Sequence, residues 1–399
     1  MRAAEIASEL GVQVTVFEAK RSVGRKFLVA GKSGLNLTNA APMDTFANRF
    51  GGAAPRGWWD WRLSGFTNDD LRAWCESFGI GTHASSGKKV FPEGMKAAPL
   101  LRRWVSRLRA RGVRFEVSYA WCGFGERPDD CSPAALKFSN GREVQADAVV
   151  FALGGGSWPA TGSDGAWQNA FSGAGIDVLP LVSANCGWEL DWPEGLPGKI
   201  EGQPLKNLLV RAAVEDSEPI PGELVVTRYG LEGGPIYRLG QELRAMTEPT
   251  LEIDFKPTFS AGRLVRKLDG VTRDHLAEAA KRWRLCDATV ALLQSALAKD
   301  VAFNGADRTP LRELAELVKA FRIPLTRPRP ISEAISSAGG VSWQAVDPET
   351  LMSRAMPGIF VCGEMLDWEA PTGGYLIHGS MLTGEIAARA AVNHLRRSP

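Results

Sequence analysis

The order of elements at the start of the chain restricts its fold more than any other feature of the sequence. Residues 2–10 place apolar side chains at helical spacing and are closed by Gly11, a residue typical of the position after a helix. Residues 12–17 are β-branched and nearly all apolar, which predicts a strand, and Glu18 follows them. A helix, a glycine, a buried strand and an acidic residue form the second half of a β–α–β unit, which is typical of α/β folds.

The first half of that unit is not in the sequence. No strand precedes residue 2, and no G-x-G-x-x-G motif is present to form the phosphate-binding turn of a dinucleotide fold. Glu18 nevertheless stands where such folds place the acid that binds the ribose hydroxyls of adenosine. Two interpretations follow, namely a sequence that lacks an upstream segment, which we favour, or a protein that binds a dinucleotide poorly.

Two later strands also end in glycine-rich turns. Residues 146–153 form an apolar run into three glycines at 154–156, and residues 358–362 run into Gly363. Two more glycines, at 373–374, precede a final helix of small residues. A helix that begins after glycines exposes unpaired backbone N–H groups at the positive end of its dipole, which suits a pyrophosphate or the pyrimidine edge of a flavin.

The pattern changes along the middle of the chain. Residues 58–82 look helical, and residues 97–111 form an amphipathic helix with a basic face, which is either solvated or binds the phosphates of a nucleotide or RNA. From about 185 to 258, short apolar strands alternate with turns. From about 260 to 322, apolar residues recur at helical spacing, and prolines then mark the exit from this segment.

Composition and charge exclude several classes of protein. The chain has 47 Lys+Arg and 45 Asp+Glu, so its net charge of +2 argues against binding nucleic acid by bulk charge alone. The six cysteines form no C-x-x-C pair, which predicts reduced thiols and no metal site. No run of 18 apolar residues and no signal peptide is present, so we expect a soluble cytoplasmic protein with no membrane contact.

Four motifs follow one another along nearly the whole chain. They are G-K-S-G-L-N-L-T-N at 31–39, G-G-G-S-W-P-A-T-G-S-D-G at 154–165, G-E-L with Thr227, Tyr229, Gly230 and Pro235 from 222 onward, and G-E-M-L-D with T-G-G-Y at 363–375. In this order they resemble the BaiN/YhiN-type NAD(P)/FAD-dependent oxidoreductases, flavoproteins of the wider glutathione-reductase-like class. Gly34-Leu35 stands where many members carry Arg-Cys, so the chain resembles the Gly-Leu-Asn-Leu-Thr branch, and no role of that Arg or Cys is carried over.

The resemblance implies an α/β architecture with a Rossmann-like, three-layer FAD-binding domain and an inserted substrate or cap domain. Residues 1–184 would form the first part of the FAD-binding domain, without its first strand and glycine loop. Residues 185–258 would form an inserted β-rich domain and residues 259–323 an inserted helical segment. Residues 324–399 would complete the FAD-binding domain.

The resemblance also implies which residues hold FAD, with Glu18 on the ribose and the glycine-rich loops on the diphosphate and the isoalloxazine. The full set is Glu18, Gly24, Lys26, Gly31, Asn36, Thr38, Asn39, Gly154, Gly155, Gly162, Asp164, Gly363, Glu364, Asp367, Thr372, Gly373, Gly374 and Tyr375. No catalytic residue is identified. His378 and Tyr375 are weak candidates for an acid or base; packing is the alternative for Tyr375, and members of the family do not generally need a histidine at the position of His378.

The expected activity is FAD-dependent electron transfer between NAD(P)H or an organic substrate and a small unsaturated acceptor or oxygen. One alternative is flavin-dependent reduction of a base in RNA, with Arg102, Arg103 and Arg107 as phosphate contacts. A second alternative is a flavin-free, degenerate scaffold, because the N-terminal dinucleotide motif is missing. A small molecule is the expected partner, and the sequence does not predict an oligomeric state.

Overall fold

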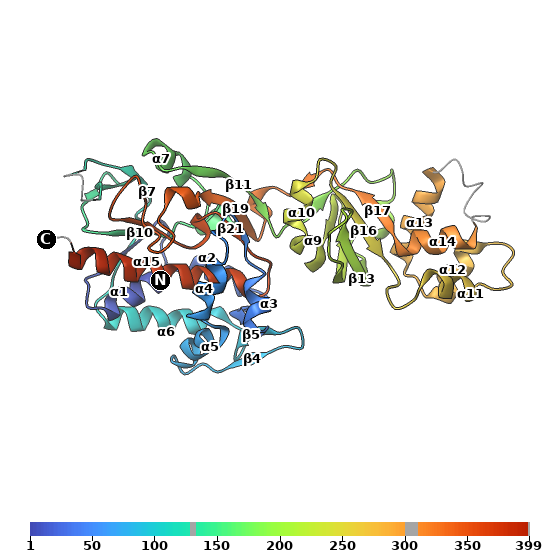
Figure 1. Ribbon diagram of the computed structural model, residues 1–399, viewed down its shortest axis with the longest axis horizontal. Coiled ribbons are helices and arrows are strands. Elements are labelled where there is room, and N and C mark those ends of the chain that lie inside the picture. The colour runs from blue at the N-terminus through green and yellow to red at the C-terminus, as the bar shows by residue number, and fades with distance from the viewer. Residues whose placement is uncertain (128–132, 300–309, 398–399) are drawn as a thin grey trace. The chain divides into compact units, whose positions relative to one another are not determined.

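The chain folds into two units, and the first is built from both ends of the sequence. A computed structural model describes residues 1–127, 133–299 and 310–397 (Figure 1), so Cys131 lies outside the described residues. Unit 1 comprises Met1–Ser183 and Ile331–Pro399, and unit 2 comprises Ala184–Pro330. Each unit has its own cluster of buried apolar side chains, so each has its own hydrophobic core.

Unit 1 contains two pairs of parallel strands. The glycine-rich turns predicted at 154–156 and at 363 follow the strands of one pair, and Glu18 ends a strand of the other. Strand β1 (Thr15–Glu18) lies parallel to β6 (Arg114–Val117), and β10 (Val149–Phe151) lies parallel to β20 (Ile359–Val361). The two pairs belong to separate sheets. Parallel pairs connected through helices are typical of α/β proteins, as predicted.

Unit 1 also contains helices and further strands (Figure 1). The helices are α1 (Arg2–Glu9), α2 (Arg25–Ala30), α3 (Met43–Ala47), α4 (Trp58–Ser64), α5 (Asn68–Glu76), α6 (Ala97–Ala110), α7 (Trp167–Gly173) and α15 (Tyr375–Arg397). The other strands are β2 (Thr38–Asn39), β3 (Gly51–Gly52), β4 (Thr82–Ala84), β5 (Lys89–Pro92), β7 (Trp121–Phe124), β8 (Leu136–Phe138), β9 (Glu143–Val144), β11 (Val178–Ala184), β19 (Ser336–Val341) and β21 (Trp368–Glu369).

A buried carboxylate joins helices that are distant in sequence. Glu5 on α1 is 1% exposed and accepts hydrogen bonds from Arg2 Nη1 at 2.9 Å and from Trp74 Nε1 at 3.0 Å. Arg107 Nη1 on α6 lies 3.6 Å from Glu5 Oε1. Because a buried charge is costly without partners, these contacts fix α1 against α5 and α6.

The segment at residues 58–82, which is predicted to be helical, contains two helices, α4 and α5, and its last residue begins β4. Helix α4 ends at Ser64, and Gly65 follows it. Thr67 then begins α5 with a capping box, in which its hydroxyl accepts from the Asp70 amide and the Asp70 carboxylate accepts from the Thr67 amide. A glycine followed by a strong capping residue ends one helix and begins another.

Unit 2 is an antiparallel sheet with helices. The strand order is β17-β16-β13-β14-β15-β12-β18. The strands are β12 (Trp188–Glu189), β13 (Pro204–Ala212), β14 (Ile220–Val226), β15 (Gly230–Glu232), β16 (Thr250–Asp254), β17 (Phe321–Pro324) and β18 (Arg327–Pro328). The helices are α8 (Pro197–Ile200), α9 (Gly234–Arg238), α10 (Gly240–Ala245), α11 (Ala261–Arg266), α12 (His275–Trp283), α13 (Asp287–Lys299) and α14 (Leu311–Lys319).

Two absences hold for the described ranges 1–127, 133–299 and 310–397. None of their helices has both the length and the apolar composition needed to cross a bilayer. No group of three or more His, Cys, Asp and Glu side chains is arranged there to bind a metal ion. The described cysteines are free thiols, of which Cys75, Cys186 and Cys362 are buried.

The sheet of unit 2 depends on a glycine in β15. A Cβ atom at Gly230 would overlap the carbonyl oxygen of Trp188 on the neighbouring strand β12. We therefore expect Gly230→Ala to lower the free energy of unfolding of unit 2 by about 2–3 kcal/mol, because the two strands must move apart. Gly198→Ala is the matched control, since a Cβ there meets no atom within 4 Å. Urea unfolding of both variants checks this, and equal midpoints would contradict it.

Candidate functional site

A lysine ammonium group on α2 lies at the centre of a polar network in unit 1. Lys26 Nζ donates to Glu364 Oε2 at 2.6 Å, to Ser157 Oγ at 2.9 Å and to Ser163 Oγ at 3.1 Å. The side chains of Lys26 and Glu364 are 31% and 13% exposed. All three ammonium donors therefore have acceptors, and the ion pair is largely screened from water.

The second carboxylate oxygen of Glu364 extends the network to β19. Glu364 Oε1 accepts from the Ser337 amide at 2.9 Å and from Ser337 Oγ at 3.3 Å. Ser337 Oγ in turn accepts from the Gly156 amide at 3.0 Å. A Cβ at Gly155 would overlap Ser337 Oγ, so a residue without a side chain is required there. The network brings together Lys26 and Glu364, both predicted site residues, with the turn after β10.

A second cluster forms at the end of β1. Glu18 Oε1 accepts from the Lys20 amide at 2.9 Å, and burial raises the pKa of the Glu18 carboxyl group. Gly162 lies beside it, since a Cβ at that position would be 3.8 Å from Glu18 Oε1. Gly162 has φ +104°, a conformation that glycine adopts without strain. The predicted residues Glu18 and Gly162 are thus neighbours, although 144 positions separate them in the sequence (162 − 18).

The loop at residues 31–39 meets the glycine turn at the start of α15. Asn39 Nδ2 donates to the carbonyl oxygen of Gly373 at 3.5 Å. A Cβ at Gly374 would overlap the backbone of Thr38, and Gly374 has φ +102°. Both glycines lie at the N-terminus of the 23-residue helix α15, where backbone N–H groups lack helical partners. Burial raises the pKa of the neighbouring Tyr375 hydroxyl.

His378 does not lie in an open site. Its side chain is 0% exposed, with Nδ1 2.8 Å from Thr38 Oγ1 and Nε2 2.9 Å from the carbonyl oxygen of Phe66. The Phe66 carbonyl can only accept, so Nε2 carries the proton and Nδ1 accepts from the Thr38 hydroxyl. Burial lowers the pKa of His378 to about 4. The imidazole is therefore neutral at pH 7 and connects α15 to β2, which accounts for its position without a catalytic role.

The remaining predicted residues are dispersed around these clusters. Asn36 is half-buried, and its Oδ1 is a buried acceptor without a hydrogen-bond partner among the described residues. Asp164 is exposed and accepts from the Ala166 amide at 3.1 Å, whereas Asp367 is buried, which raises its carboxyl pKa. The other predicted residues are Gly24, Gly31, Gly154, Gly363 and Thr372. Three of these glycines have a positive φ, which is +72° at Gly24, +79° at Gly154 and +69° at Gly363.

The serines of the network were not predicted. Ser157 and Ser163 lie within one of the quoted motifs, but nothing in the local sequence marks their hydroxyls as partners of a lysine. Ser337 is in no quoted motif and contacts Glu364 across 27 positions. The spacing of these residues carries no signal, because the contacts depend on how separate loops meet in space.

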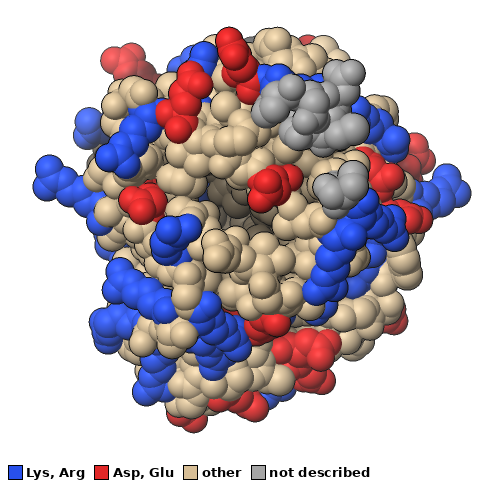
Figure 2. All heavy atoms as spheres, turned by 90° about the vertical axis from the view of Figure 1, so that its left-hand side faces the viewer, with Lys and Arg blue, Asp and Glu red and all other residues tan. Residues whose placement is uncertain are grey.

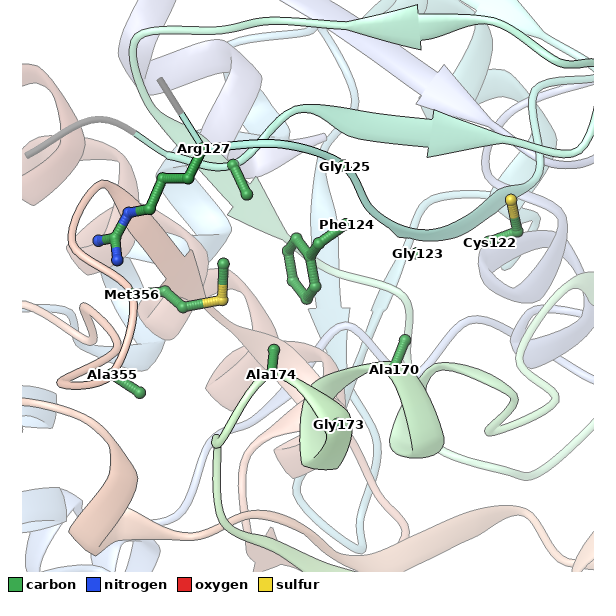
Figure 3. A pocket seen from close by; sticks show the side chains of 11 residues that line it. Cys122, Gly123, Phe124, Gly125, Arg127, Ala170, Gly173, Ala174, Ala355 and Met356 are labelled. Atoms are coloured by element: carbon green, nitrogen blue, oxygen red, sulfur yellow. The ribbon is translucent and has the colours of Figure 1, made fainter. Parts of the chain in front are cut away.

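A pocket of about 520 Å³ lies elsewhere in unit 1 (Figure 3). It is formed by β7 with the segment after it, by α7 and by the loop before β20, and Phe124 and Met356 point into it. Its lining residues are Cys122, Gly123, Phe124, Gly125, Arg127, Ala134, Ala170, Gly173, Ala174, Ala355 and Met356. None of the predicted site residues lines this pocket.

The arginines predicted as phosphate contacts differ in the hydrogen bonds that their guanidinium groups already donate within the protein. Arg103 donates to the carbonyl oxygens of Phe78 and Gly79, at 2.5 Å and 2.9 Å. Arg107 donates to Ser77 Oγ at 2.9 Å, and its guanidinium lies 3.4 Å from the centre of the Phe78 ring. Arg102 is exposed. On the face shown in Figure 2, acidic side chains interrupt the basic ones around a central hollow.

Known proteins resemble this chain along nearly its whole length. The family model of the HI0933-like protein Rossmann domain matches residues 1–390. The 3-dehydro-bile acid delta(4,6)-reductase of Clostridium scindens is 26% identical over 400 residues, which cover 96% of this chain and 94% of that protein. The ribosomal RNA dihydrouridine synthase of Haemophilus influenzae is 21% identical over 380 residues, covering 94% and 90%.

The chain is also similar to solved structures, at low sequence identity. The 3-ketosteroid-delta4-(5alpha)-dehydrogenase of Rhodococcus jostii RHA1 is 14% identical, with a TM-score of 0.49, over 100% of this chain and 94% of that chain.

His378 makes the stability of unit 1 depend on pH. Its pKa is about 4 in the folded protein and 6.5 when unperturbed, so the unfolded chain binds more protons between these values. The part of the free energy of unfolding that depends on His378 is therefore fully present above pH 6.5. It is lost as the pH decreases towards 4, and the loss amounts to about 3 kcal/mol. The free energy of unfolding is measured by urea unfolding at a series of pH values. In His378→Gln, the decrease of this free energy between pH 6.5 and 4 should be smaller by this amount. His83→Gln, at an exposed position, should keep the full decrease, and equal decreases in all three proteins would refute the assignment.

The Lys26–Glu364 pair should show a measurable coupling energy. Unfolding of Lys26→Met, Glu364→Gln and the double variant should give about 1–3 kcal/mol of coupling, because the pair is largely removed from water. Lys137–Glu143 is the control pair, since it is 3.4 Å apart with 47% and 52% exposed side chains. That exposed pair should couple by less than about 0.5 kcal/mol. Equal coupling in the two pairs would show that the network does not stabilise unit 1.

Proposed function

The chain belongs to the HI0933-like protein Rossmann-domain family, and from this membership we propose that it binds FAD and reduces a small unsaturated organic compound. The predicted family resemblance and the predicted Rossmann-type α/β fold are confirmed by the match to residues 1–390. The chain is thus an oxidoreductase of the flavoprotein class, as predicted. One observation carries the proposal for FAD. Glycine-rich turns that are far apart in the sequence, at 154–156, 363–365 and 373–374, come together at buried polar side chains.

The described residues fit a dinucleotide with a flat ring. The orphaned Asn36 Oδ1 lacks a hydrogen-bond donor, and a ring N–H of a bound flavin would supply one. Gly162 beside Glu18 leaves space where a side chain would otherwise stand, and Glu18 offers a carboxylate to ribose hydroxyls. The N-terminus of α15, preceded by Gly373 and Gly374, offers backbone N–H groups to an anionic group.

The roles of the chain's own residues follow from these positions. Glu18 would hold the adenosine ribose, and Lys26 with Glu364 would hold the turns at 154–156 and 363–365 in register around the diphosphate. The glycine turn at 373–374 would place the α15 dipole on the flavin pyrimidine edge. When bound, FAD would supply hydride and single-electron transfer.

The electron donor and acceptor are proposals that rest on the relatives. The Clostridium scindens relative is named for the reduction of an unsaturated bile acid derivative, which supports a small unsaturated acceptor here. We propose NAD(P)H as the electron source, and transient docking of the nicotinamide, because the sequence contains no G-x-G-x-x-G motif that would form a separate nicotinamide-binding domain. Unit 2, with its own core, would contribute substrate selectivity.

Reduction of a base in RNA is the second candidate. The Haemophilus influenzae relative is named as a ribosomal RNA dihydrouridine synthase, and Arg102 on α6 is exposed. Arg103 and Arg107 already donate to carbonyl oxygens and to Ser77, which makes them weaker candidates for phosphate contacts. RNA binding should weaken steeply between low and physiological ionic strength, whereas reduction of a small molecule should change little.

The first test is the visible absorption spectrum of the purified protein with and without added FAD. We expect the absorption bands of a protein-bound flavin, and we expect NADH or NADPH to bleach them under anaerobic conditions. Glu18→Gln should weaken FAD binding about 10- to 150-fold, because a hydrogen bond to a charged group contributes about 1.5–3 kcal/mol. Glu76→Gln, an exposed residue of α5, should bind FAD as the parent protein does. A protein that stays colourless at saturating FAD would favour the flavin-free scaffold.

A further inference from the structure

A lysine side chain reaches the glycine turn that precedes α15. Lys89 is the first residue of β5, and it pairs with Asn39 of β2. Residues directly opposite each other in an antiparallel pair have their side chains on the same face of the sheet. A Cβ at Gly373 would lie 3.8 Å from Lys89 Cε and 3.9 Å from Asn39 Nδ2. The Lys89 ammonium group, one bond beyond Cε, is therefore beside the N-terminus of α15.

An arginine from the segment after α3 lies near the same helix terminus. Burial raises the pKa of the Tyr375 hydroxyl, and the positive charge of Arg49, which is half-buried, opposes that shift. Phe46 and Phe50 stand on either side of Arg49 in the sequence. Their ring centres lie 4.8 Å and 6.1 Å from the centre of the Tyr375 ring. Arg49 is thus close to the first residue of α15.

Neither cation has an anionic partner in the protein. In the part of the chain that the structure describes, no carboxylate forms an ion pair with Lys89 or Arg49, and neither side chain donates a hydrogen bond. The Tyr375 hydroxyl likewise has no hydrogen-bond partner among those residues. Cations at the N-terminus of a helix are unfavourable, because the helix dipole is positive there. Two cations and a hydroxyl group without an acceptor therefore point to a ligand that carries negative charge.

FAD gains negative charge at the edge that the proposed function assigns to this helix terminus. A hydride adds two electrons and one proton to the neutral oxidised ring, so the reduced ring carries one negative charge. That charge is shared by N1 and the C2 carbonyl oxygen, which belong to the pyrimidine edge. Fixed positive groups beside atoms that become negative during a reaction favour the step that produces the charge.

We propose that Lys89 and Arg49 stabilise the negative charge that reduction places on the pyrimidine edge of FAD, and so make the bound flavin easier to reduce. This inference rests on the proposed function, because it requires FAD to bind with that edge at the N-terminus of α15. The role is electrostatic, so it depends on the positive charge of each side chain and not on its shape. Reduced FAD, rather than oxidised FAD, is the form that gains affinity.

The test is the midpoint potential of FAD bound to the parent protein and to Lys89→Met, measured without substrate. Oxidised FAD should bind the variant within about 3-fold of the parent protein, because the oxidised ring is neutral. Affinity for reduced FAD should fall about 10-fold, which for two electrons corresponds to a midpoint potential lower by about 30 mV. Lys89→Arg keeps the charge and should keep the potential. The melting temperature should be unchanged in both variants, because Lys89 is exposed.

Further variants separate charge at this terminus from charge in general. Lys88→Met removes the same charge one residue earlier, at an exposed position with no atom among those nearest to a Cβ at Gly373. It should change the affinity for reduced FAD by less than about 2-fold, because water and salt screen an exposed charge. Arg49→Met should lower the potential in the same direction as Lys89→Met, and Arg49→Lys should restore it.

Three results would overturn the proposal. The first is an unchanged potential in Lys89→Met, or an equal change in Lys88→Met. The second is an equal loss of affinity for oxidised and reduced FAD, which would place the lysine on the diphosphate. The third is an unchanged potential together with weaker binding of acetate, followed through the flavin absorption, which would assign the cations to a carboxylate of the acceptor. If the parent protein binds no FAD, the proposed function itself fails, and this inference fails with it.

Discussion

The ion pair between Lys26 and Glu364 is the contact on which the candidate site depends. It joins two side chains that are 338 positions apart, and through Ser157, Ser163 and Ser337 it fixes the turn after β10 against β19 and the turn after β20. Loss of either partner would leave the other charge largely buried and unpaired, which costs more than the pair itself contributes. The geometry of the turns therefore depends on both charges.

The sequence predicts those parts of the site that a local pattern describes. Glu18 follows a strand, and the glycines at 154–156 and 373–374 follow an apolar run or precede a helix, so each could be recognised from its neighbours. The partners of Lys26 could not, because a hydroxyl at Ser337 becomes significant only when β19 packs beside the turn. Helix boundaries show the same limit, since the prediction of a helical segment at residues 58–82 did not include the break that Gly65 and Thr67 make between α4 and α5.

The basic face of α6 shows why charge alone does not identify a binding surface. Arg103 and Arg107 have the spacing of a phosphate-binding stripe, yet both donate to carbonyl oxygens of residues 77–79, directly after α5, and Arg107 also packs on Phe78. Long cationic side chains can bond to carbonyl oxygens of the protein itself or bind the phosphate of a ligand, and the sequence pattern is the same in both cases. Only the positions of their acceptors distinguish a structural arginine from one available to a ligand.

The division of unit 1 between the two ends of the chain determines the order in which the protein can fold during synthesis. Residues 184–330 leave the ribosome as a complete unit with its own core, while residues 1–183 still lack β20 and α15. Unit 2 can therefore fold first, and unit 1 must wait with β10 unpaired and with apolar surface that α15 later covers. During this interval the nascent chain offers a strand edge to aggregation or to a chaperone, a cost of inserting one domain into another.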